Sequence, residues 1–143
     1  MSPPERVATC DGDIQTATSS EFFLTNRLKT RNFIWAELNA LGVIVFWIEN
    51  LPRDGTGCPG WWMFDQMMAH FTPRVVAIKG SWTFGDNLET VNVLTGSGVP
   101  IEIAATRGPT GRYATAHGYS RVTLLSGIGV DGAYTGVSVL FER

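Results

Sequence analysis

Polar side chains that could bind a ligand gather at residues 79–87 of this 143-residue chain. An apolar run at residues 75–78 precedes them, and Asp86 followed by Glu89 is the pattern of a capping box. The stretch therefore predicts a buried strand, a tight turn and a helix start, where unpaired backbone N–H groups favour a binding site. The predicted ligand contacts are the polar and aromatic residues of this stretch, Lys79, Ser81, Trp82, Asp86 and Asn87.

Glu49 is added to this predicted site because it follows a second apolar run, residues 43–48. Ligands of sheets with parallel strands tend to bind beyond the carboxyl ends of the strands, so both strand ends are expected near one another. A purely structural interpretation stays open, in which Asp86 only caps the helix and the neighbouring glycines only permit the turn. The ligand would be a small molecule of unknown identity.

A second set of residues fits nucleophilic catalysis. Cys58 comes just before a predicted helix, whose dipole can lower the pKa of the thiol. His117 is a candidate general base, and Asp131 could orient it, so the order resembles that of papain-type cysteine proteases. The alternative function is thus a cysteine-dependent hydrolase with Cys58 and His117 as catalytic residues. A small buried cysteine beside aromatic residues is the ordinary explanation of Cys58.

Composition excludes several other classes. The formal net charge of −2 argues against nucleic-acid binding, and no apolar run reaches the 18 residues that a membrane span needs. Cys10 and Cys58 have no metal-ligand spacing and are predicted to be reduced thiols, so no metal and no cofactor are expected. The first 20 residues lack the features of a signal peptide, which predicts a cytoplasmic protein, or a secreted effector if the chain belongs to a longer one.

The predicted fold is α+β (mixed α/β), with residues 1–19 as a flexible arm and residues 20–143 as a single domain. Leu24, Leu28, Trp35, Leu38 and Leu41 recur at helical spacing and predict a long N-terminal helix that ends at Gly42. The later elements form a parallel βαβ unit, three short helices and a C-terminal hairpin, which gives a mixed sheet of about four strands. Their predicted ranges are 43–48, 61–71, 75–78, 86–96, 100–106, 109–117, 121–125 and 134–141.

The apolar content, 44% of residues, indicates surface for a partner. Trp35, Trp47 and Trp62 are predicted to be core residues, and Trp82 in the turn is the tryptophan expected to touch a ligand. A cluster around residues 61–68 exceeds one buried helix face, so a homodimer or another protein partner is expected there. Its members are Trp61, Trp62, Met63, Phe64, Met67 and Met68.

Three stretches, GSWTFGDNL, TGRYATAHGYSRVTLL and GAYTGVSVLFER, carry a family resemblance over about residues 75–143. Together they resemble small uncharacterised bacterial modules, some of which are found at the C-termini of polymorphic toxins. The resemblance implies a bacterial origin and an effector role and assigns no residue a function. The predicted function is a small soluble effector-like or ligand- or partner-binding module with its site at residues 79–87.

Overall fold

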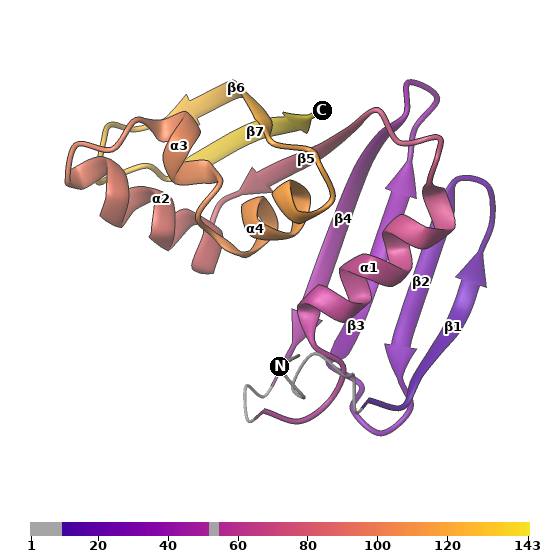
Figure 1. Ribbon diagram of the computed structural model, residues 1–143. Coiled ribbons are helices and arrows are strands. Elements are labelled where there is room, and N and C mark those ends of the chain that lie inside the picture. The colour runs from indigo at the N-terminus through magenta and orange to yellow at the C-terminus, as the bar shows by residue number, and fades with distance from the viewer. Residues whose placement is uncertain (1–9, 52–54) are drawn as a thin grey trace, which may run out of the picture. The chain divides into compact units, whose positions relative to one another are not determined.

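The computed structural model describes residues 10–51 and 55–143 (Figure 1). These residues form seven strands and four helices. The chain divides into two compact units, Met1–Val75 and Val76–Arg143, and each is described separately. The predicted single domain over residues 20–143 stays a prediction.

The first unit is an antiparallel sheet whose four strands follow one another in sequence order, with helix α1 against one face (Figure 1). Its elements are β1 (Gly12–Ala17), β2 (Glu21–Asn26), β3 (Asn32–Leu38), β4 (Val43–Asn50) and α1 (Gly60–Phe71). Met63, Phe64 and Met67 on α1 are fully buried, and the Phe64 ring meets Phe46 of β4 edge-on at 5.4 Å between centroids. The predicted strand 43–48 and helix 61–71 are confirmed.

The predicted long N-terminal helix is wrong, because β2 and β3 occupy that segment. Leu28 and Leu41 of the supposed helical stripe lie in the turns after β2 and β3, where their side chains are about four-fifths exposed. Asparagine side chains form these turns: Asn26 Oδ1 accepts the Leu28 N–H at 2.7 Å, and Asn39 Oδ1 accepts the Leu41 N–H at 2.9 Å. Asparagine stabilises turns in this way, so the spacing matched a helix by coincidence.

Strand β1 differs from the loose arm expected over residues 1–19, because Gly12–Ala17 pairs with β2. The Thr18 hydroxyl accepts the Glu21 N–H at 3.0 Å and so closes the turn between the two strands. A threonine hydroxyl can cap a helix through the same hydrogen bond, but here the bond closes a hairpin. The part of the predicted arm at residues 1–9 lies outside the described residues.

The second unit has three antiparallel strands, with β7 between β5 and β6, and three helices on one side of them (Figure 1). Its elements are β5 (Ala77–Trp82), α2 (Asp86–Gly96), α3 (Ile101–Ala105), α4 (Pro109–Ala116), β6 (Arg121–Ile128) and β7 (Gly136–Glu142). Ile78, Val139 and Phe141 are fully buried on the face that the helices cover. The three short helices and the C-terminal hairpin are confirmed with small changes in their bounds.

The predicted fold class is wrong in its sheet and in its helices. Seven strands are present in the described residues instead of about four, and the longest helix there is α1, with 12 residues. Strand, helix and strand do follow one another as β4, α1 and β5, but β4 belongs to the first unit and β5 to the second. Every strand pairing within either unit is antiparallel.

Candidate functional site

The predicted strand-turn-helix site does not converge on one place. Successive side chains of a strand point to opposite faces, so Lys79 and Ser81 share one face of β5 while Ile78 and Trp82 share the other. The Ser81 hydroxyl lies 3.2 Å from that of Ser138 on β7. Lys79 and Ser81 therefore lie on the face away from the three helices.

Trp82, the predicted ligand contact, points into the core of the second unit. Only 7% of it is exposed, and its ring lies 6.3 Å from that of Phe141. The indole also covers Gly80, where an added Cβ would come within 2.7 Å of the ring. Trp82 is thus a packing residue, and Gly80 provides the space for its ring.

Asp86 and Asn87 lie in the first turn of α2, but neither caps it. The N-cap is Gly85, with φ at 87°, and no side chain caps the helix, so the predicted capping box is wrong. Asn87 instead binds the start of α4: its Oδ1 accepts the Thr110 N–H at 3.0 Å, and its Nδ2 donates to the Thr110 hydroxyl at 3.1 Å. Asn87 therefore joins two helices, a structural role that leaves its amide engaged.

Tyr113 on α4 is the group near Asp86 whose pKa is shifted. Burial raises the pKa of the Tyr113 hydroxyl, the Arg112 charge lowers it, and the Asp86 charge raises it further. The burial that raises this pKa favours the neutral form of the phenol.

Glu49 belongs to the first unit and is held by its own neighbours. Its carboxylate accepts a hydrogen bond from Arg31 Nε at 2.5 Å and one from the Trp47 indole N–H at 3.4 Å. The Arg31 hydrogen bond lowers the pKa of Glu49, burial raises it, and the Trp47 hydrogen bond lowers it in turn. Glu49 is thus an ionised partner of Arg31 within the first unit.

Cys58 is bonded to Cys10, so the predicted reduced thiols are wrong. The Cys58 sulfur is fully buried and carries no thiolate in this state. His117 follows α4 in the second unit, and Asp131 accepts a hydrogen bond from the Tyr134 hydroxyl at 2.9 Å. The predicted nucleophile of the hydrolase, the Cys58 sulfur, is thus engaged in a disulfide.

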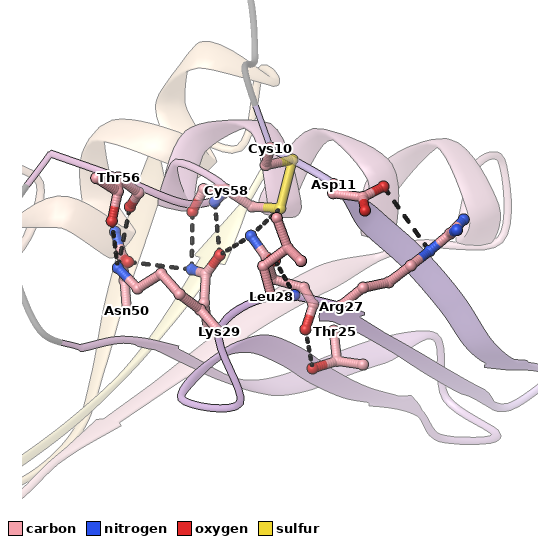
Figure 2. Close-up of a disulfide and its surroundings, with 11 residues drawn as sticks. Cys10, Asp11, Thr25, Arg27, Leu28, Lys29, Asn50, Thr56 and Cys58 are labelled. Carbon is pink, nitrogen blue, oxygen red and sulfur yellow. Dashed lines mark hydrogen bonds and ion pairs between the residues drawn. A yellow bond between two sulfur atoms is a disulfide. The ribbon is translucent and has the colours of Figure 1, made fainter.

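A buried asparagine cluster fixes the backbone of Cys58. Figure 2 shows the disulfide between Cys58 and Cys10. Asn32 Oδ1 accepts the Cys58 N–H at 2.5 Å, and Asn32 Nδ2 donates to the Cys58 carbonyl at 2.9 Å. Asn26 Nδ2 donates to Asn32 Oδ1 at 3.2 Å. Gly57 has φ at 86°, and a Cβ there would come within 2.7 Å of Asn32 Oδ1, so this turn requires glycine.

A pocket of about 360 Å³ lies beside this disulfide. It is lined by Cys10, Asp11, Asn26, Leu28, Lys29, Thr56 and Gly57. Figure 2 shows the Lys29 side chain reaching Thr56, where the ammonium donates to the carbonyl and to the hydroxyl at 3.1 Å each. Lys29 and Thr56 bind each other, so we interpret this pocket as part of the structure around the disulfide and not as a ligand site. Within residues 10–51 and 55–143, no cluster of three or more metal-ligating side chains is found.

The feature that sequence reasoning missed is the face of the first sheet that α1 does not cover. Phe23, Trp35 and Trp47 lie directly opposite one another on β2, β3 and β4 and form a row across three strands. Trp35 is 38% exposed and Trp47 is 47% exposed, although both were predicted to be core residues. Phe33 extends the row, with its ring 5.8 Å from that of Phe23. We call Phe23, Phe33, Trp35 and Trp47 the open aromatic face.

The predicted dimer contact, in contrast, is largely interior. Met63, Phe64, Met67 and Met68 are at most 2% exposed, and α1 packs against β2, β3 and β4. The cluster therefore supplies the core of the first unit, and the homodimer stays a prediction without the surface first expected to form it. No helix within the described residues is long and apolar enough to cross a membrane.

No family model, curated protein or solved structure matches this chain. The resemblance to bacterial toxin-associated modules stays a prediction. Within the described residues, the open aromatic face is the candidate functional site, because it presents two exposed tryptophans in a regular array.

Proposed function

We propose that this protein is a binding module that recognises a segment of a partner protein on the open aromatic face. The single observation that supports this function is the row Phe23, Trp35 and Trp47, in which Phe23 is half-buried and both tryptophans are exposed. Residues directly opposite on neighbouring strands have Cβ atoms about 5 Å apart, so the row presents a continuous aromatic strip. Tryptophan and tyrosine are the residues enriched at protein interfaces, and a regular exposed array of this kind marks an interaction surface.

The shape of the surface favours a protein segment over a small molecule. Small ligands bind in concave pockets that cover most of their surface, whereas these side chains project from one face of a sheet. This proposal keeps the binding-module class predicted from the sequence and moves the site from residues 79–87 to the first unit. The hydrolase alternative is not carried further, because the Cys58 sulfur is engaged in the disulfide.

The disulfide also gives information on whether the protein works inside or outside the cytosol. Disulfides form and persist in oxidising surroundings and are rare in the cytosol, so we propose that the chain works outside the cytosol, in place of the cytoplasmic location predicted from composition. An effector role is compatible with that location. Alkylation of the thiols in protein taken directly from cells tests this point: two blocked cysteines support it, and two reactive thiols contradict it.

A selection experiment tests the proposed site. A library of random 12-residue peptides is panned on the wild-type protein and counter-selected on Trp35→Thr/Trp47→Thr, in which threonine preserves strand propensity. Phe84→Ala is the matched control, because Phe84 is an exposed aromatic residue of the second unit, 66% exposed. We expect to select peptides that bind the wild type and Phe84→Ala but do not bind Trp35→Thr/Trp47→Thr. Failure to enrich any such peptide, with the variants folded by circular dichroism, contradicts the proposal.

A further inference from the structure

Carboxylates flank the open aromatic face. Glu21 and Glu37 lie directly opposite each other on β2 and β3. They are two residues along each strand from Phe23 and Trp35, and therefore on the same face of the sheet. Like charges in this position destabilise a sheet. Two acidic residues opposite each other therefore point to a function that needs negative charge here.

Two arginines of the first unit are already paired with other carboxylates. Arg31 pairs with Glu49, and Arg27 lies 3.8 Å from Asp11 and from Asp13. Among residues 10–51 and 55–143, no ion pair is found for the carboxylate of Glu21 or of Glu37. Both residues are exposed, so their charges are presented to the solvent next to the aromatic row.

From this charge we infer that the partner segment is basic, with Arg or Lys side chains that stack on Trp35 and Trp47 and pair with Glu21 and Glu37. The inference rests on the proposed function and adds the chemistry of the partner. Cations are attracted to the faces of aromatic rings, tryptophan most strongly, and a neighbouring carboxylate adds a charge-assisted hydrogen bond. An extended segment fits best, because its alternate side chains point to one side at a spacing of about 7 Å.

The experiment uses two synthetic eight-residue peptides, one with arginine alternating with threonine and one with citrulline in place of each arginine. Citrulline is nearly isosteric with arginine and is neutral, so the pair isolates the charge. Both are titrated into the wild type, Glu21→Gln/Glu37→Gln and the matched control Glu89→Gln/Glu102→Gln. The control removes two exposed carboxylates from α2 and α3 of the second unit, which gives the same change in net charge.

We expect the arginine peptide to bind the wild type and the control with equal affinity. Its affinity for Glu21→Gln/Glu37→Gln should be lower by a factor of about ten or more. Its affinity for the wild type should fall as the salt concentration rises. The citrulline peptide should bind at least about tenfold more weakly to the wild type. Equal binding of the two peptides, or equal losses in both glutamine variants, overturns the inference. If library peptides that require Trp35 and Trp47 prove neutral, the proposed function stands and this inference fails. If no peptide depends on the tryptophans, the proposed function itself fails.

Discussion

Reduction of the Cys10–Cys58 disulfide should destabilise the first unit by up to about 4 kcal/mol. The bond joins residues 48 apart in sequence, and closing a loop of that length removes about 14 cal/mol/K from the entropy of the unfolded chain. The disulfide also connects the start of β1 to the turn before α1, two segments that are far apart in the sequence. Measured effects often fall below this entropic value, so about 2–4 kcal/mol is expected.

Urea unfolding followed by tryptophan fluorescence, with and without reductant, measures this effect. Trp82 is the one tryptophan of the second unit, so the signal reports mainly the first unit. The double variant Cys10→Ser/Cys58→Ser serves as the control and should not respond to the reductant. Oxidised and reduced wild type that unfold within about 1 kcal/mol of each other would refute the reasoning that this bond constrains the unfolded chain.

Three further predictions concern stability and titration. Asn32→Ala should lower the free energy of unfolding by about 2–5 kcal/mol, because the buried N–H and carbonyl of Cys58 lose their partner. Asn39→Ala, in an exposed turn, should lower it by about 1 kcal/mol or less. Urea unfolding measures both variants, and equal losses of stability would contradict the role of the buried cluster. Glu37→Gln should raise the free energy of unfolding by about 0.2–1 kcal/mol by removing the repulsion of Glu21, and no gain would argue against the pairing. The hydrogen bond to Asp131 is the main cause that raises the pKa of Tyr134 above 10.0, and burial is the second. The stability that this hydrogen bond contributes is therefore present below pH 10 and is lost as the pH rises through the higher pKa of the folded state. Asp131→Asn should lower the Tyr134 pKa in a spectrophotometric titration, and an unchanged pKa would contradict this assignment.

The second half of the chain could be predicted because its local signals agree with one another. Proline at the start of α4 and glycine just after it indicate the helix that forms. The apolar run 75–78 indicates β5 only in part, because the strand spans Ala77–Trp82 and includes residues predicted to form a turn. The first 50 residues mislead because Leu28 and Leu41 complete a helical period while standing in turns. The asparagines at positions 26 and 39, whose side chains accept the N–H groups of these turns, were the available signal.

The candidate site was misplaced for a related reason. Trp35 alternates with buried Ile34 and Ala36, a period of two that would have placed it on an exposed face if the segment had been interpreted as a strand. Trp82 is the last residue of β5 and lies on the same face of the strand as Ile78, so the same alternation directs its side chain into the core. The pairing of Cys10 with Cys58 depends on a contact across 48 residues, which spacing in the sequence does not show.

The most direct test of the account is the affinity of one selected peptide for three proteins measured side by side: wild type, Trp35→Thr/Trp47→Thr and Phe84→Ala. Truncated tryptophans at the centre of an interface commonly cost 2 kcal/mol or more, so the account predicts a loss of at least about tenfold in the threonine variant. It predicts an unchanged affinity in Phe84→Ala. Equal affinity for the wild type and the threonine variant would contradict binding on the open aromatic face.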